Sequence, residues 1–189
     1  AMIRMNFTTV STVLATLACA LIAPNALADD FDCRGVVGNR SIDSNVVVRG
    51  ECTLDGTRTD GNVLLKRGAV LRIVNGARID GNLQSDAADL VLVRDAYIDG
   101  DVQLEGVESE ISIDDSNVTG NVQLKKNDAG IRVVSSEVKG DVQAFENRGP
   151  LRIDANTIDG NLQCKENRSQ PLGRSNRVKG NKEDQCRRL

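Results

Sequence analysis

The chain has 189 residues, of which 40% are hydrophobic and 2% aromatic, and its 27 acidic side chains outnumber its 24 basic ones. It contains no histidine, which removes the commonest general base and every Ser–His or Cys–His catalytic arrangement. An overall acidic chain also argues against nucleic-acid binding. We therefore expect a protein that is not an enzyme, holds no cofactor and has no nucleic-acid partner.

Residues 1–28 have the features of a secretory signal peptide. They carry a single charge, then an apolar run over about residues 10–23, and Ala26-Leu27-Ala28 has the A-x-A form of a cleavage site. The alternative is a membrane anchor, but the run is shorter than the ~20 residues that a span needs. We expect residues 29–189 to be a single domain exported by a bacterium, with no transmembrane segment after cleavage. Its destination would be the periplasm, the cell surface or the extracellular space.

A glycine recurs at nearly constant spacing through the rest of the chain. The steps between successive members are 20, 19, 20, 20, 20 and 20 residues, and self-similarity at such a period marks a stacked repeat architecture. Most of these glycines are followed by Asn or Asp, then by Val or Leu, then by Gln. We interpret them as turn residues. They are Gly61, Gly81, Gly100, Gly120, Gly140, Gly160 and Gly180.

Around each glycine, apolar and polar residues alternate, which is typical of a strand with one buried face. In one repeat, Val118 precedes Gly120 by two residues and Val122 follows it by two. A second alternation, here Ile111 and Ile113, lies in the middle of the repeat, and no repeat has a helical stripe. Two or three short strands in each repeat predict an all-β fold, a parallel β-helix, or solenoid.

We expect about eight coils of about 20 residues each. The first is degenerate, with Ser44 in the glycine position 17 residues before Gly61. The single 19-residue step should be absorbed by a shorter turn around Asp86–Asp89. Left-handed hexapeptide helices repeat every ~18 residues, so the longer period and the absence of a hexad pattern favour a right-handed coil.

Four cysteines remain after the signal peptide, and an even number in an exported chain indicates disulfides. Cys33 and Cys52 are 19 residues apart, and Cys164 and Cys186 are 22 apart. Each of these pairs would lie on neighbouring coils within disulfide reach, whereas the other pairings would join opposite ends of the rod. We predict one disulfide at each end. A zinc site is the alternative, which the absence of histidine and the separation of the pairs disfavour.

Two polar series recur with the glycines and should face outward. Gln84, Gln103, Gln123, Gln143 and Gln163 should stack into an amide ladder, as should Asn62, Asn82, Asp101, Asn121, Asp141 and Asn161. Both series have two interpretations, a structural ladder or a ligand face for an envelope or environmental polysaccharide, with the Gln residues as the candidate ligand contacts. The aromatic residues Phe31, Tyr97 and Phe145 fall at different coil positions, so they should not line up as a stacking platform.

Charge is unevenly distributed. Asp60, Asp80 and Asp99 would place three acids on adjacent coils; either solvent screens them or they hold a divalent cation such as Ca²⁺. Residues 29–60 carry a net charge of −3 and residues 164–189 one of +5, which favours head-to-tail self-association of the rod. The alternatives for the basic end are a solubilising cap and a contact with anionic envelope polymers or lipid.

The Gly-Asn/Asp-Val/Leu-Gln repeats and the ending Gly180-Asn181-Lys182-Glu183-Asp184-Gln185-Cys186 resemble a family of uncharacterised secreted bacterial β-helix proteins. The resemblance covers roughly residues 33–186 and implies the fold and export, with no activity to carry over. The coil pattern is also similar to bactofilins, bacterial polymer-forming β-helices, in periodicity alone; bactofilins are cytosolic and lack this signal peptide and these cysteines. We expect a non-catalytic structural or interaction protein of the envelope or extracellular matrix, or alternatively a polysaccharide-binding module.

Overall fold

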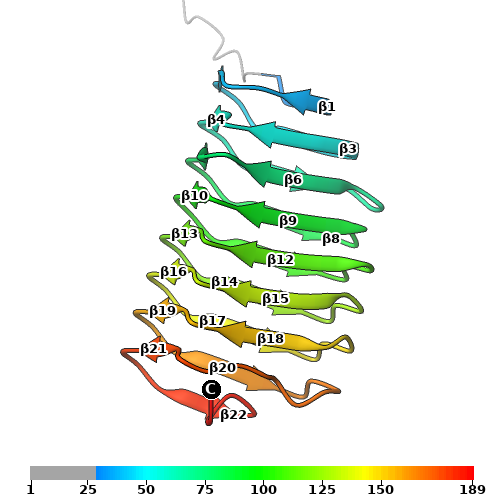
Figure 1. The fold of residues 1–189 in the computed structure, drawn as a ribbon. Helices are drawn as coiled ribbons and strands as arrows, with labels where there is room; N and C mark the ends of the chain where they lie inside the picture. Colours follow the sequence, from blue (N-terminus) through cyan, green and yellow to red (C-terminus); the bar gives the residue numbers. More distant parts are fainter. Residues whose placement is uncertain (1–28) are drawn as a thin grey trace, which may run out of the picture.

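The computed structural model describes residues 29–189, so the predicted signal peptide lies outside the described residues. These residues form 22 strands and no helix. The strands stack in parallel into one 14-stranded and one 8-stranded sheet (Figure 1). This confirms an all-β solenoid of about eight coils, with no helix in the described part long and apolar enough to cross a membrane.

Each coil has three faces, named here the amide face, the central face and the narrow face. The amide face stacks β5 (Val63–Leu65), β8 (Leu83–Asp86), β11 (Val102–Glu105), β14 (Val122–Lys125), β17 (Val142–Phe145), β20 (Leu162–Lys165) and β22 (Lys182–Asp184). The central face stacks β6 (Val70–Val74), β9 (Leu90–Arg94), β12 (Glu110–Asp114), β15 (Gly130–Val134) and β18 (Leu151–Asp154). The narrow face stacks β2 (Ser41–Ile42), β4 (Arg58–Thr59), β7 (Ala77–Ile79), β10 (Ala96–Ile98), β13 (Asn117–Val118), β16 (Glu137–Val138), β19 (Thr157–Ile158) and β21 (Arg177–Val178).

Two long strands at the start of the rod belong to both the amide and the central face. β3 (Val46–Asp55) pairs with β5 through Val46–Val48 and with β6 through Glu51–Asp55, so it bends from one face to the next. β1 (Phe31–Val37) lies along both parts of β3, with a register shift between Cys33 and Gly35. This bend is why the two faces count as one sheet.

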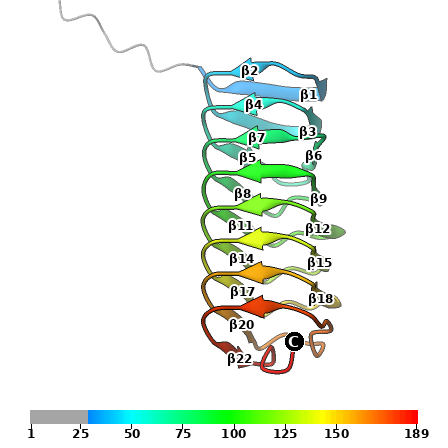
Figure 2. The ribbon, with the colours of Figure 1, turned by 60° about the vertical axis from the view of Figure 1, so that its left-hand side comes forward.

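The coil is right-handed, as the sequence predicts. Strands of the central face run leftward in front in Figure 1. When the left side is turned forward in Figure 2, the narrow-face strands again run leftward while the chain descends from its start to its end. This is the hand that connections between parallel strands adopt in nearly all proteins.

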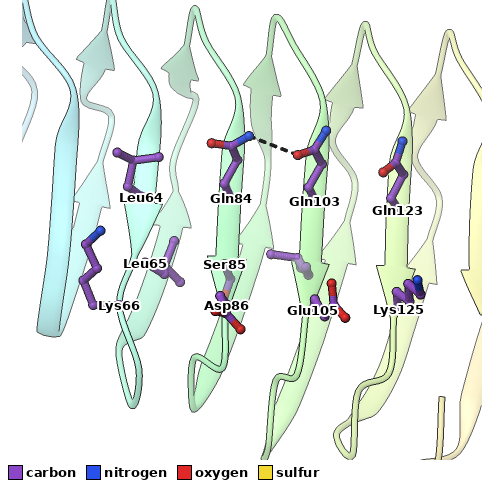
Figure 3. A pocket seen from close by; sticks show the side chains of 11 residues that line it. Leu64, Leu65, Lys66, Gln84, Ser85, Asp86, Gln103, Glu105, Gln123 and Lys125 are labelled. Atoms are coloured by element: carbon purple, nitrogen blue, oxygen red, sulfur yellow. Dashed lines mark hydrogen bonds between the residues drawn. The ribbon is translucent and has the colours of Figure 1, made fainter. Parts of the chain in front are cut away.

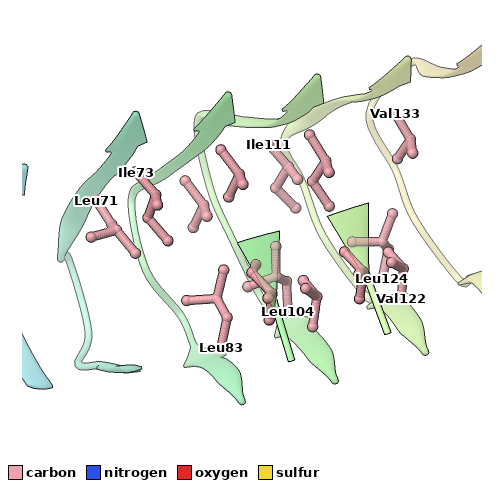
Figure 4. Packing of buried hydrophobic residues seen from close by; sticks show 14 of the residues in the cluster. Leu71, Ile73, Leu83, Leu104, Ile111, Val122, Leu124 and Val133 are labelled. Carbon is pink, nitrogen blue, oxygen red and sulfur yellow. The ribbon is translucent and has the colours of Figure 1, made fainter. Parts of the chain in front are cut away.

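The core is a set of apolar columns that run along the rod, because each coil returns to the same register. Val102, Val122 and Val142 are Cα partners on successive amide-face strands, and all three are fully buried. Ile111 and Val133, both buried, belong to the opposing wall from the central face (Figure 4). A one-residue slip would turn every one of these side chains into solvent, so the apolar pattern fixes the register.

The 19-residue step is absorbed elsewhere than expected. The turn around Asp86–Asp89 is not shortened, because residues paired between β6 and β9, which follows that turn, are still 20 residues apart in the sequence. Residues paired between β7 and β10 are 19 apart. The Cα partners that define these offsets are Val70 with Leu90 and Ala77 with Ala96. The residue is therefore lost between β9 and β10, where Asp95, at φ 48°, replaces Asn75-Gly76. One residue in the left-handed region suffices to turn this corner.

Both predicted disulfides are present. Cys33 on β1 is bonded to Cys52 on β3 with a Cα–Cα distance of 5.7 Å, and Cys164 on β20 is bonded to Cys186 with 5.2 Å. Each bond joins neighbouring coils at one end of the rod. At the second end, Cys186 and Leu189 are buried, so the residues after β22 close the apolar interior.

The seven repeated glycines lie, as expected, in the bends between narrow-face and amide-face strands, although none of them has a positive φ. They are required because their backbones touch. The Gly140 amide donates to the Gly120 carbonyl oxygen at 3.1 Å. A Cβ on Gly140 would lie 2.5 Å from Asn121 Oδ1 and 2.7 Å from that same carbonyl oxygen, so no other residue fits. Ser44 holds the corresponding place under Gly61, which confirms the degenerate first coil.

Replacing Gly140 with alanine should therefore destabilise the rod by about 2–3 kcal/mol, because the new methyl group must push apart two coils or break a side-chain hydrogen bond. Gly130→Ala is the matched control: its Cβ would meet only Pro150 Cγ, at 3.7 Å, and should leave stability nearly unchanged. Thermal unfolding followed by circular dichroism, with disulfides intact, measures both. Equal midpoints for the two variants would contradict the stacking argument.

Candidate functional site

The Asn/Asp series after the glycines forms a continuous ladder, as predicted, but it bonds to the backbone. Each side-chain Oδ1 accepts from the main-chain N–H of the equivalent residue in the next coil; Asn121 Oδ1, for example, accepts from Asp141 N at 2.9 Å. The same bond recurs seven times from Asn45 to Asn181, at 2.6–2.9 Å. These oxygens satisfy backbone donors at the corner beside the glycines, where the strand ladder is interrupted. The Oδ1 atoms of this series are therefore used within the rod.

A second amide ladder is buried, and sequence reasoning missed it. Asn127, Asn147 and Asn167 point into the rod, and Gln185 continues the column. The Asn147 side chain donates to Leu124 O at 2.9 Å and accepts from the backbone N–H of Asn127 at 3.0 Å. The signal that could have revealed it is the exact 20-residue recurrence of Asn at these positions.

A third column lies at the corner before the narrow face. Ser116, Ser136, Asn156 and Asn176 are all buried there. Ser116 N–H donates to Ser136 Oγ at 3.2 Å, and Ser136 N–H donates to Asn156 Oδ1 at 2.9 Å. Within residues 29–189 no buried side-chain nitrogen or oxygen lacks a hydrogen-bond partner. Satisfied buried polar groups of this kind stabilise one arrangement of the coils.

Asn147→Leu should destabilise the rod by about 2–4 kcal/mol, because it leaves the Asn127 N–H and the Leu124 carbonyl oxygen buried without partners. Gln143→Ala, in the same coil but on the outer surface, loses only a half-exposed amide contact and should change stability by less than about 1 kcal/mol. Chemical denaturation of the two variants beside the wild type tests the difference. If Asn147→Leu unfolds at the same denaturant concentration as the wild type, the buried ladder is not a stabilising element.

The Gln series is a ladder only in part. Gln84 Nε2 donates to Gln103 Oε1 at 3.0 Å, Gln143 Nε2 to Gln163 Oε1 at 2.9 Å, and Gln163 Nε2 to Glu183 Oε2 at 2.8 Å. Gln123, in the middle of the row, forms no such bond with either neighbour, and Figure 3 shows its amide standing apart from that of Gln103. The outward series therefore has a gap in its centre.

A groove of about 370 Å³ lies over this part of the amide face. It crosses four coils, from β5 to β14, with Leu64 and three Gln side chains along its length (Figure 3). Leu64 takes the Gln position of its coil, since its Cα partner is Gln84. Charged side chains at the ends of the strands line one rim of the groove: Lys66, Asp86, Glu105 and Lys125.

The run of three acids on the narrow face is explained by two arginines. Arg58 contacts both Asp60 and Asp80, and Arg78 contacts both Asp80 and Asp99, so each cation lies between two carboxylates. In the described part of the chain, no group of three or more Asp, Glu, Cys or His side chains is placed to hold a metal ion. Neither solvent screening nor a bound cation is needed to explain these acids. The sequence pattern of the acids alone does not reveal these contacts, because each arginine lies two residues before one acid and also reaches the acid of the next coil.

Alternating charges continue along the same face to the basic end. Asp159 lies between Lys139 and Lys179, with Lys179 Nζ 2.8 Å from Asp159 Oδ1. The hydrogen bond and the charge of Lys179 lower the pKa of Asp159 below its usual value. A carboxyl with a lowered folded-state pKa stabilises the fold above its unfolded pKa of about 3.9, and this contribution is lost as the pH falls through the lowered value.

Lys179→Gln should consequently lower the unfolding temperature at neutral pH, and the gap to the wild type should close below about pH 4, where Asp159 takes up a proton in both proteins. Thermal scans between neutral pH and about pH 2.5 measure the gap. Arg67→Gln, which replaces an exposed cation away from this stripe, is the control and should show no pH-dependent gap. A gap that stays constant with pH would rule out the assigned ion pair.

The three aromatic residues among residues 29–189 lie on different elements, as the sequence predicts. Phe31 on β1 has the Arg40 guanidinium 4.8 Å from its ring centroid, and Tyr97 on β10 has that of Arg78 at 4.1 Å. Each of these two rings forms a cation–π contact with an arginine. Phe145 differs, because it occupies an outward position of β17 on the amide face, half-buried and paired in register with Lys125 of the preceding coil.

Fold and side-chain arrangement together define a right-handed parallel β-helix with three polar ladders between its coils and a disulfide at each end. Comparison with protein-family models, with curated proteins and with solved structures found no match. One concave outer surface of the described residues, the groove of the amide face, includes the amide of Gln123, which is not bonded to its Gln neighbours. That surface can donate and accept hydrogen bonds along a line parallel to the rod axis.

Proposed function

We propose that the chain is an exported, non-catalytic structural and interaction protein of the bacterial envelope or extracellular matrix. The observation that carries the proposal is the use of its polar side chains. Asn and Ser residues bond coil to coil, the four cysteines are in disulfides, and many acids contact cations. A rod built this way presents a rigid surface, and its disulfides suit an oxidising compartment outside the cytosol.

The proposed mode of self-association is head to tail. Residues 29–60 carry a net −3 and residues 164–189 a net +5, so the first coils of one rod attract the last coils of another. At the basic end Arg187 and Arg188 are exposed while Cys186 and Leu189 are buried. The contact would thus be made by a charged surface, and a heterologous contact of this kind can grow into a filament.

The double charge reversal Arg187→Glu with Arg188→Glu tests this mode. We expect residues 29–189 to form oligomers at low ionic strength that dissociate as salt shortens the screening length, and the variant to remain monomeric at low salt. Light scattering coupled to size exclusion, with negative-stain imaging of the same fractions, measures both.

The matched control is Arg94→Glu with Lys126→Glu, which changes the net charge equally but at exposed positions in the middle of the rod. It should associate more like the wild type. If the wild type is a monomer at every salt concentration, or if both double variants behave alike, the head-to-tail contact is wrong.

A second candidate function is polysaccharide binding on the amide face. The groove favours it, because a surface that only stabilised the rod would complete its Gln ladder across all coils. The two functions are compatible, since an end-to-end rod leaves its lateral faces accessible.

A further inference from the structure

We infer that the amide face between Leu64 and Phe145 is a binding site for one extended, uncharged polysaccharide chain that lies parallel to the rod axis. The inference deepens the second candidate function above, and it does not require end-to-end association. Three features of this surface carry it: unpaired amides, a neutral rim, and apolar side chains at both ends.

The amides are the first feature. Gln123 has its amide oxygen and nitrogen unengaged by the Gln side chains on either side, and Gln143 uses its nitrogen for Gln163 but leaves its oxygen. An amide offers a donor and an acceptor side by side, the pair that two neighbouring hydroxyl groups of a sugar can match. All of these side chains are half-buried and lie in one row, so little conformational entropy is lost when a ligand binds.

The rim determines the charge of the ligand. Lys66 and Lys125 are balanced by Asp86 and Glu105, and Glu105 also contacts Lys126 at 3.4 Å. A strongly anionic polymer would meet carboxylates at the centre of the groove, and a cationic one would meet lysines at both ends. A neutral polyhydroxyl chain meets hydrogen-bond donors and acceptors of both kinds without such repulsion.

The ends of the surface are apolar. Leu64 fills the Gln position on β5, and Phe145 lies outward on β17, one coil beyond the groove. Sugar rings have apolar faces that pack against aliphatic and aromatic side chains, so each end can hold one ring while the amides between them bind hydroxyls. A single aromatic ring at one end is enough for this purpose and does not require the aligned platform that the sequence lacks.

The spacing suits an extended chain. Successive coils are ~4.8 Å apart, so the four steps from β5 to β17 span ~19 Å. This spacing is close to the length of one sugar unit in an extended β-linked glycan, so the glycan would advance by about one unit per coil. An extended peptide advances ~3.3 Å per residue, so its residues would not match the spacing of the coils.

The test uses residues 29–189 with both disulfides intact and a series of β-linked glucose oligomers from the disaccharide to the hexasaccharide. Calorimetry and NMR shift mapping should show binding that tightens with each added sugar and levels off at about five units, with shifts confined to the amide face. Gln123→Ala and Phe145→Ala should each weaken binding by about fivefold or more. Asn117→Ala, which removes an exposed amide from the narrow face, should bind like the wild type.

Each contrary result is decisive. Affinity that does not depend on chain length, unchanged binding by both variants, or shifts on another face would overturn the inference. Tighter binding of the anionic probe polygalacturonate would show that the rim argument is wrong. If Gln123→Ala instead changes the mass of the protein in light scattering, the amide face is covered by a second copy of the chain. None of these outcomes depends on Arg187 and Arg188, so the end-to-end proposal stands or fails separately.

Discussion

The contact between glycine backbones is the constraint on which the regular rod depends. From Gly120 to Gly180, two coils approach so closely that the amide of each repeated glycine bonds the carbonyl of the glycine one coil earlier, and a side-chain oxygen from the Asn/Asp ladder lies against the same spot. Any Cβ there would separate the coils. The apolar columns, the parallel strand pairs and the buried amide columns all require the coil spacing that this contact allows.

Much of the fold could be predicted from the sequence because stacking makes distant residues equivalent. The constant period fixes the register, so it also identifies which cysteines meet and that Ser44 replaces a glycine. The period does not determine whether a side chain at a corner faces the solvent or the interior. Asn121 faces outward beside a glycine and Asn127 faces the interior, although both are Asn in a 20-residue series. The direction depends on backbone angles, such as the positive φ of Lys126, which a polar residue type does not reveal.

The candidate site was predicted less completely, for a similar reason. The Gln row is visible in the sequence, but the interruption at Gln123 depends on which rotamer each amide adopts beside its neighbours. The pairing of Arg58 and Arg78 with the three aspartates depends on side chains that reach across to the next coil. The shortened corner at Asp95 was misplaced because a lost residue shifts all later positions equally, whichever turn contains it.

The placement of the two disulfides has a mechanical consequence. Each closes a loop of about one coil, from Cys33 to Cys52 and from Cys164 to Cys186, and neither bond crosses the middle of the rod. If the protein were pulled by its two ends, the looped segments would be shielded from the load, and only the stretch between Cys52 and Cys164 would lengthen. At ~3.3–3.6 Å per residue, its roughly 112 residues would release about 370–400 Å of contour length. The rod would then act as a tether whose greatest extension is limited by its covalent cross-links.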